Sequence, residues 1–260
     1  MNSSAAGSEP VLRRCRPVLG TFVEVAVSGA APESLDRAVQ AAFGSVERVH
    51  ELMTFHDPTS ELGRLNRTRR GRWLTIDPAL AEVLGLAADL YRESGGHFSI
   101  AKPVQRQPGP GFELRGHRAR RTSLARLDLG GIAKGYAVDR AVEAILNEAP
   151  QAAGIVNAGG DLRVFGAAEQ RIWARHGSPD EPQVRGTWLR DGAMATSTSG
   201  PGGVHVDGLS GKPLRRVRTV VVRAEHCFVA DALTKVALFA PLRIVRKVAT
   251  RYGARVGFLV

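Results

Sequence analysis

The feature that most constrains the fold of this 260-residue chain is a long amphipathic stretch that begins at Pro32. Apolar residues recur there at steps of three or four, which is the period of one face of a helix. This spacing predicts a helix that must pack its apolar face against other parts of the chain. The residues of that face are Leu35, Ala38, Val39, Ala42, Phe43, Val46, Val49 and Met53.

Further helices and several strands are expected downstream. The next helix begins after Asp77, an N-cap residue that precedes Pro78, and it ends at the glycine pair after Ser94. Other helices are expected at 132–149, 229–239 and 242–252. Runs rich in valine, isoleucine and phenylalanine predict strands at 18–28, near 154–157, 161–166, 171–175 and 218–224, and at 255–260. Helices and strands that alternate without an internal repeat indicate an α+β fold.

The start of the chain and one internal stretch differ in composition from the rest. Residues 1–10 are small and polar, so we expect a disordered head followed by one domain over 11–260. Between Ala101 and Leu127, prolines and glycines are frequent, and seven basic residues face a single acidic one, Glu113. This composition predicts a short, mobile connection or flap within the domain.

The net charge of +11 comes mostly from arginine, because only five of the 36 basic residues are lysines. Arginine, alanine and glycine are abundant together, a combination typical of GC-rich genomes that weakens the case for nucleic-acid binding. A ligand that carries several phosphates fits the charge equally well. A basic nucleic-acid-binding module therefore remains the more distant alternative, and we expect no nucleic-acid partner.

Cysteine usage and the N-terminal residues bear on the compartment. Cys15 and Cys227 are far apart, which argues against a disulfide framework or a zinc site. Arg13, Arg14 and Arg16 stand where a signal peptide needs an apolar run, and no segment approaches the roughly 18 to 20 apolar residues of a membrane span. We expect a cytoplasmic protein without a membrane anchor or a usable lipobox.

Two glycine-rich turns are candidate ligand sites. The stretch from Gly130 to Gly135 follows a short apolar run and opens a helix, so its N–H groups and the positive helix end can approach a phosphate. The alternative is a strand-to-helix turn with a surface lysine, since the stretch matches neither the phosphate-loop nor the GxGxxG pattern. The segment from Asn157 to Asp161 either lines a ligand or is a tight turn between strands.

Two further residues carry possible chemistry. His205 follows a hydroxyl- and glycine-rich loop over 196–203, which can donate hydrogen bonds to an anion, although a lone histidine before a turn is more often structural. Asp231 lies at an expected helix start, where an aspartate is commonly a cap or a partner of the helix dipole. None of these segments decides the function alone.

Taken together and in order, the segments resemble the ApbE-type FAD:protein FMN transferases over most of the chain. The string DLGGIAKGYAVD, from Asp128 to Asp139, is highly specific. The other matching segments are Leu19-Gly20-Thr21, Ser60-Glu61-Leu62 with Arg64-Leu65-Asn66, Gly96-His97-Phe98, Asn157 to Asp161, Thr198-Ser199-Gly200, His205-Val206-Asp207 with Gly211, and Ala230 to Leu233.

The resemblance implies a two-lobed α+β fold, related to the T-fold, with mixed sheets, packed helices and FAD between the lobes. It also implies which side chains contact the cofactor. Those expected near the flavin are Leu19, His56, His97, Phe98 and Ser99, where Ser99 replaces an aspartate of the family pattern. Those expected along the dinucleotide are Gly130, Lys134 and Tyr136, with Val206 beside His205.

The resemblance further implies a magnesium ion bound by the backbone oxygen of Ala133, by Asp231 and by a threonine four residues later. That last position is Lys235 in this chain, with Thr234 one residue earlier. Two outcomes are open: the Lys235 ammonium replaces the charge of the cation, or Thr234 takes over as a ligand and Lys235 turns toward phosphate. We expect the second, with a weakened metal site.

The implied activity is the transfer of the FMN half of FAD to a serine or threonine hydroxyl of an acceptor protein, with release of AMP. A divalent cation neutralises the pyrophosphate in such a reaction, and the enzyme positions the reacting groups. Asp231 and His205 are the candidate catalytic residues, and either could help to remove the hydroxyl proton. The nearer alternative is a protein that binds FAD, or hydrolyses it to FMN and AMP, without modifying a protein.

Overall fold

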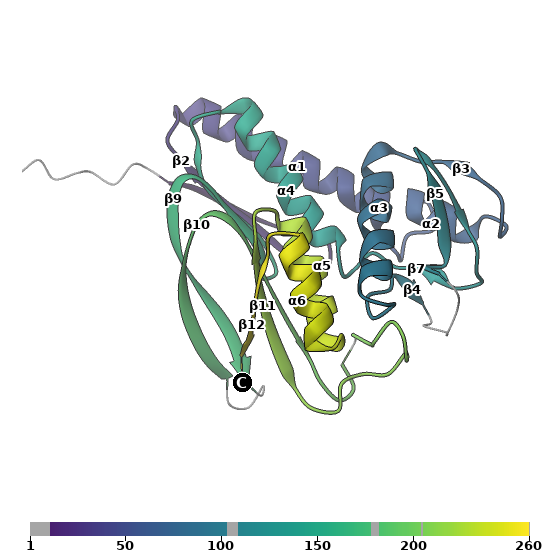
Figure 1. The fold of residues 1–260 in the computed structure, drawn as a ribbon. Coiled ribbons are helices and arrows are strands. Elements are labelled where there is room, and N and C mark those ends of the chain that lie inside the picture. The colour runs from purple at the N-terminus through teal and green to yellow at the C-terminus, as the bar shows by residue number, and fades with distance from the viewer. Residues whose placement is uncertain (1–10, 103–108, 178–181, 204, 260) are drawn as a thin grey trace, which may run out of the picture.

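The computed structural model describes residues 11–102, 109–177, 182–203 and 205–259, which form two lobes (Figure 1). A seven-stranded sheet with helices on one face makes the larger lobe, and a small sheet beside α2 and α3 makes the smaller one. The expected disordered head lies outside the described residues. The helices are α1 (Pro32–Met53), α2 (Glu61–Arg67), α3 (Pro78–Glu93), α4 (Ala133–Glu148), α5 (Cys227–Phe239) and α6 (Leu242–Arg251).

The large sheet confirms the expected α+β class, but every strand pair described in it is antiparallel rather than mixed. Its strands follow the chain order except that β2 pairs with β8, so the whole small lobe is inserted between these two neighbours. In spatial order they are β1 (Leu12–Val18), β2 (Thr21–Ser28), β8 (Ala153–Ala158), β9 (Asp161–Gly177), β10 (Pro182–Ser199), β11 (Arg218–Ala224) and β12 (Arg255–Leu259).

Two tight turns lie side by side at one end of this sheet. Leu19 and Gly20 join β1 to β2 with φ angles of 58° and 70°, and Gly159 and Gly160 join β8 to β9 with φ angles of 64° and 101°. Turns with positive φ at both central residues suit the right-handed twist of a hairpin. A Cβ at Gly159 would lie 2.5 Å from the Thr21 hydroxyl oxygen, so glycine is needed for the two turns to touch.

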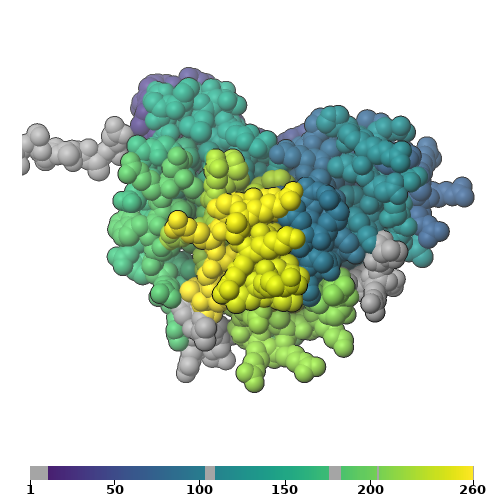
Figure 2. All heavy atoms as spheres, in the orientation of Figure 1, coloured from purple at the N-terminus to yellow at the C-terminus, as the bar shows by residue number. Residues whose placement is uncertain are grey.

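The helices α1, α4 and α5 cover one face of the large sheet, and α6 lies against α5 and β12 (Figure 1). Alternation along β10 directs Ala193 and Ala195 into the core beneath the helices, whereas Met194 belongs to a smaller apolar cluster on the other face. In the space-filling view the yellow C-terminal segment lies between the green strands and the blue α3 (Figure 2). The contact with α3 includes an ion pair of 2.9 Å between Arg251 and Glu93.

The smaller lobe corrects the expectation of a flap at 101–127. Residues 103–108 lie outside the described residues, but most of the remainder forms strands and contributes Phe112, Ala119 and Leu127 to the core. Helix α2 was not expected, although Ser60 caps it by accepting a hydrogen bond of 2.9 Å from the Gly63 N–H. The strands of this lobe are β3 (Leu74–Thr75), β5 (Phe112–Arg115) and β6 (Arg118–Arg121), with β4 (Ala101–Lys102) paired to β7 (Arg126–Leu127).

The predicted long helices are confirmed, whereas the strand pattern is confirmed only in part. The two short runs at 161–166 and 171–175 form the single strand β9, and β10 was not expected. Residues 196–199 therefore belong to a strand and not to a loop. No helix within the described part of the chain is long and apolar enough to cross a membrane.

The crossing of α4 and α5 sets the geometry of the candidate site. Asp139 on α4 accepts hydrogen bonds of 3.0 and 2.8 Å from the N–H groups of Cys227 and Phe228, which open α5. One turn earlier, a Cβ at Gly135 would lie 2.3 Å from the Cys227 carbonyl oxygen and 2.7 Å from the Asp231 Cβ. Glycine at 135 therefore allows the two backbones to approach closely.

Gly135→Ala should force α4 and α5 apart, since the added methyl group would clash with backbone that cannot rotate away. We expect a loss of about 2 kcal/mol or more in the free energy of unfolding, and a melting temperature lower by about 4 to 8 °C. Gly44→Ala at an exposed position of α1, where a Cβ meets nothing within 4 Å, is the matched control and should stabilise by about 0.5 to 1 kcal/mol. Equal melting temperatures for the two variants would contradict this account of the crossing.

Candidate active site

Two pockets lie on either side of the Gly130–Gly131 turn at the start of α4. The larger, of about 630 Å³, is lined by the side of the turn that holds Gly130, and the smaller, of about 50 Å³, by the side that holds Gly131. Asp128 contributes to both. The larger pocket contains the predicted residues Leu19, His56, Gly130, Ala133 and Lys134, and the smaller contains His97, Phe98, Ser99, His205 and Val206.

The buried carboxylate of Asp231 pairs with one lysine from each of the two pockets. Asp231 is the fifth residue of α5 and is fully buried, rather than a cap at an exposed helix start. Its Oδ2 accepts a hydrogen bond of 3.0 Å from the Gly135 N–H and lies 3.8 Å from Nζ of Lys134, and its Oδ1 forms an ion pair with Lys235. Because Lys134 lines the larger pocket and Lys235 the smaller, one aspartate holds a cation for each.

Asp161 completes the charge cluster from the β8–β9 turn. It is buried and forms an ion pair with Lys134. Burial alone would lower the pKa of Lys134, but the charges of Asp231 and Asp161 outweigh burial and raise that pKa above its ordinary value. Burial would raise the pKa of Asp231, and the ammonium groups of Lys235 and Lys134 instead hold it below its usual range. Lys134 and Asp231 are therefore both charged at neutral pH.

The residues around Asp231 do not form a donor set that fits a divalent cation. Lys235 Nζ, itself positive, lies on Oδ1 and also donates to the Asp231 carbonyl oxygen at 3.2 Å. The Thr234 hydroxyl is buried, donates to that carbonyl at 2.7 Å and lies 2.8 Å from the Ser197 hydroxyl on β10. Hard cations bind to oxygen atoms that are available as ligands, and the side-chain oxygens of Asp231 and Thr234 are bonded to other groups here.

Ala133 lines the larger pocket, but its role as a backbone ligand stays a prediction. Thr234 as a ligand also stays a prediction, and its contacts speak against it. Within the part of the chain that the structure describes, no group of three or more histidine, cysteine, aspartate or glutamate side chains is placed to hold a metal ion.

The backbone N–H groups of the Gly130–Tyr136 segment are largely used by the protein itself. Gly130 donates to the Asp128 carboxylate at 2.8 Å, and Gly135 donates to Asp231. Ile132 and Ala133 both donate to the Leu129 carbonyl oxygen. A phosphate at this turn would consequently meet the charges of lysine side chains more than a row of available N–H groups.

His205 lines the smaller pocket together with Lys102 and Lys235. Burial lowers its pKa to about 4, and the charges of Lys235, Lys102 and Lys134 act in the same direction. Lys102 is itself held by an ion pair of 2.6 Å with Asp128. The imidazole is thus neutral at physiological pH, and one of its ring nitrogens carries a free lone pair.

The loops that carry His97 and His205 are fastened to each other. His97 Nδ1 lies 2.8 Å from the Asp207 carboxylate, and the Gly208 N–H donates to the His97 carbonyl oxygen at 2.9 Å. A Cβ at Gly208 would lie 2.8 Å from the Ser99 Cβ, so this contact also depends on glycine. These contacts bring together segments that are about a hundred residues apart in the sequence.

Tyr136 lies away from both pockets, in contrast to its expected place along the dinucleotide. Its side chain is buried, its hydroxyl donates to Glu82 on α3 at 2.8 Å, and its ring packs edge-on against Phe228 at 5.1 Å. These contacts join α4 to α3 and to α5. A cofactor contact by Tyr136 stays a prediction without support from this geometry.

Two site residues were missed by the sequence analysis. Asp161 was placed only in a segment that either lines a ligand or forms a turn, and Lys102 only in a flexible segment, although both supply charge to the site. A clue was available in the lysines: three of the five in the chain, Lys102, Lys134 and Lys235, converge here.

A family model described as the ApbE family matches residues 19–106 and 104–258. The chain belongs to the ApbE family. No curated protein sequence matches it.

Solved structures of ApbE proteins share the fold over nearly the whole chain. The ApbE protein from Thermotoga maritima is 22% identical, with a TM-score of 0.82 over 96% of this chain and 94% of that one. The apo form of the flavinyl transferase ApbE from Pseudomonas stutzeri is 20% identical, with a TM-score of 0.77 over 97% and 91%. The flavin transferase ApbE from Vibrio cholerae is 18% identical, with a TM-score of 0.78 over 97% and 94%. At such identities the likeness shows the ApbE fold.

The lowered pKa of His205 predicts a stability that depends on pH. The folded protein binds a proton at His205 only near pH 4, whereas the unfolded chain binds it near the ordinary value of 6.5. The stability that depends on neutral His205 is therefore fully present above pH 6.5 and is lost as the pH falls from 6.5 toward 4. Melting curves of wild type and His205→Gln from pH 7.5 to 4.5 should show the wild type losing stability relative to the variant. A difference that stays constant over this range would mean that the ring is solvated.

Proposed function

We propose that this ApbE-family protein transfers the FMN moiety of FAD to a serine or threonine hydroxyl of an acceptor protein and releases AMP. The observation that carries the proposal is the pair of pockets divided by the Gly130–Gly131 turn, with a lysine on each side of Asp231. FAD consists of two bulky parts joined by a pyrophosphate. The larger pocket can take one of these parts, and the pyrophosphate would then meet lysine side chains at the turn.

The apolar wall of the larger pocket suits one aromatic part of FAD. Leu19 and Met53 line it together with the rings of Phe55 and His56, which pack edge-on with centroids 5.4 Å apart. Leu19 is held at a φ of 58°, which a non-glycine residue rarely adopts, so the hairpin turn fixes its direction toward the pocket. The flavin contacts expected of His97, Phe98 and Ser99 would place part of the ligand in the smaller pocket.

The proposed reaction forms one bond and breaks one. The acceptor hydroxyl oxygen attacks the phosphorus of the FMN moiety, and the bond from that phosphorus to the bridging oxygen breaks, so that AMP leaves with the electron pair. Negative charge grows on the bridging oxygen and on the phosphate oxygens as this bond breaks. Lys134 and Lys235, held by Asp231, supply fixed positive charge where that change occurs.

His205 is the better candidate of the two for receiving the hydroxyl proton. Asp231 is fully buried, and each of its carboxylate oxygens already accepts from a donor of the protein. His205 lines the smaller pocket as a neutral imidazole, so it can accept the proton as the new bond to phosphorus forms. Its lowered pKa makes it a weak base, which suits a step driven mainly by positioning and charge.

The purified protein should bind FAD and, with a suitable acceptor, release AMP and yield an acceptor that carries covalent FMN. Flavin fluorescence titration measures the binding, chromatography measures the AMP, and mass spectrometry of the acceptor measures the added FMN. AMP and free FMN without a labelled acceptor would indicate hydrolysis instead. A folded protein that gives no saturable change with FAD, but binds RNA or DNA in a salt-sensitive manner, would favour a nucleic-acid-binding module.

His205→Ala should lower AMP release by about 100-fold or more, in the range observed when a proton-transfer group is removed. Its unfolding free energy at pH 7.5 should change by no more than about 1 kcal/mol, because the side chain lines a pocket and not the core. His117→Ala, an exposed position at the tip of the β5–β6 hairpin, is the matched control and should retain turnover. Full turnover by a stable His205→Ala variant would remove His205 from the reaction.

A further inference from the structure

Every oxygen of Asp231 is already bonded to a group of the protein. Oδ1 accepts from the Lys235 ammonium, Oδ2 from the Gly135 N–H, and the carbonyl oxygen from both Lys235 and the Thr234 hydroxyl. A divalent cation could reach the carboxylate only by displacing an ammonium group that is covalently part of the chain. The two positive charges would then repel each other across a site that excludes most water.

The Lys235 side chain is fitted to this position along its whole length. Its stem lies against Gly131, where a Cβ would be 3.4 Å from the lysine Cε and 3.5 Å from its Cγ. Only 11% of the side chain is exposed, and that part lines the smaller pocket beside His205. The ammonium group is therefore held at the pocket wall and does not swing freely in solvent.

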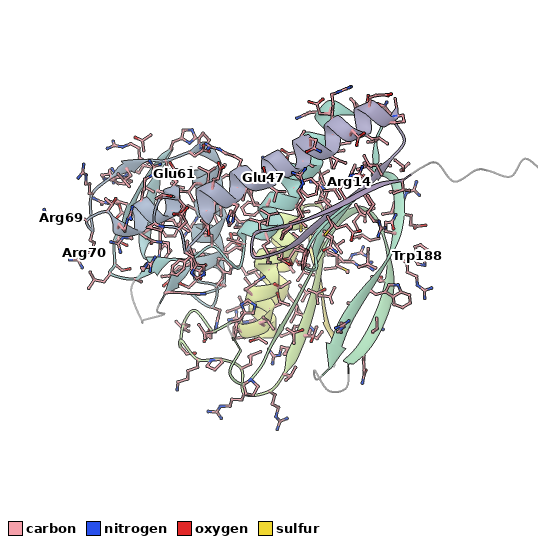
Figure 3. All side chains as sticks on the ribbon, turned by 180° about the vertical axis from the view of Figure 1, so that it is seen from behind. Arg14, Glu47, Glu61, Arg69, Arg70 and Trp188 are labelled. Atoms are coloured by element: carbon pink, nitrogen blue, oxygen red, sulfur yellow. The ribbon has the colours of Figure 1, made fainter. Side chains whose placement is uncertain are left out.

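The charge of the site is supplied by lysine and not by the far more numerous arginines. No arginine lines either pocket among the residues that the structure describes. Arg69 and Arg70 illustrate where arginines lie instead, since they project from the far end of the small lobe (Figure 3). Lysine presents a compact point charge that can approach a phosphate oxygen much as a metal ion does.

We propose that the Lys235 ammonium replaces a divalent cation at this site, so that the protein binds and cleaves FAD without added metal. This inference rests on the proposed function. With the pyrophosphate bound, Lys235 balances the charge that develops on the departing AMP, while Asp231 holds the ammonium in place. The acceptor proton still passes to His205, and no further reactant is required.

The first test compares the wild-type protein in EDTA with the same protein in excess Mg²⁺. We expect the FAD dissociation constant and the rate of AMP release to differ by no more than about twofold between the two buffers, because the lysine charge is already in place. Titration of the FAD-free protein with Mn²⁺, followed by electron paramagnetic resonance, should show no saturable binding. An increase of about tenfold or more in affinity or rate on adding Mg²⁺, or stoichiometric binding of Mn²⁺, would overturn the proposal.

These outcomes separate this inference from the proposed function. FAD binding that requires Mg²⁺ would overturn the replacement by lysine and leave the flavin transfer intact. The absence of FAD binding in both buffers would overturn both. Neither comparison needs a variant, so a failure of a substituted protein to fold cannot obscure the answer.

Variants then assign the effect to the ammonium group itself. Lys235→Met keeps an unbranched stem but removes the charge, and it should weaken FAD binding in EDTA by about tenfold or more. Lys235→Thr should do the same in EDTA and, unlike wild type, should bind Mn²⁺ and recover FAD affinity with Mg²⁺. Lys247→Met, an exposed position on α6, is the control and should leave both properties unchanged. Unaltered FAD affinity in folded Lys235→Met would contradict the proposal.

Discussion

The architecture of the site depends on one buried carboxylate, Asp231. A buried, charged aspartate is stable only when donors and positive charges compensate it. The Gly135 N–H of α4 and the Lys235 ammonium on the next turn of α5 donate to Asp231, and the Lys134 ammonium adds a positive charge 3.8 Å away. Each of these contacts fixes the position of a helix or of a charged side chain. The Gly135 N–H fixes the crossing of the two helices, and the lysines fix where positive charge faces the two pockets. The same contacts to Asp231 therefore determine both how the helices pack and where the charges lie.

The parts of the fold that could be predicted are those with a local periodic signal. The helix from Pro32 carries a clear apolar period, the helix after Asp77 carries a clear N-cap as well, and both are found as expected. Strand β10 lacked such a signal, because a register shift between Arg190 and Gly192 interrupts its alternation. The β5–β6 hairpin is rich in arginine, and part of that charge is accommodated by stacking on Trp73, with guanidinium carbons 4.7 to 5.8 Å from the ring centroid.

The sequence motifs identified several residues of the site, but they did not show which of those residues interact with each other. Lys134 and Lys235 were both singled out, but that they share one aspartate follows from a helix crossing that no local pattern encodes. Asp161 was recognised as the end of a glycine turn, yet its partner, Lys134, is 27 residues away at the start of α4. Tyr136 shows the opposite case: it sits inside the most specific motif, and its contacts are those of a core residue.

The lysine stem that lies against Gly131 has a consequence for the conditions under which such a site can operate. A metal ion is a solute, so its occupancy rises and falls with the supply in the surrounding solution, whereas a side chain is present in every molecule at a fixed ratio. In the proposed transfer of FMN, the same tether means that the charge cannot depart together with the nucleotide product, as a loosely held ion can. Release of that product must then break the contact with the ammonium directly, which makes the departure step, rather than cation supply, the natural place for this protein to be slow.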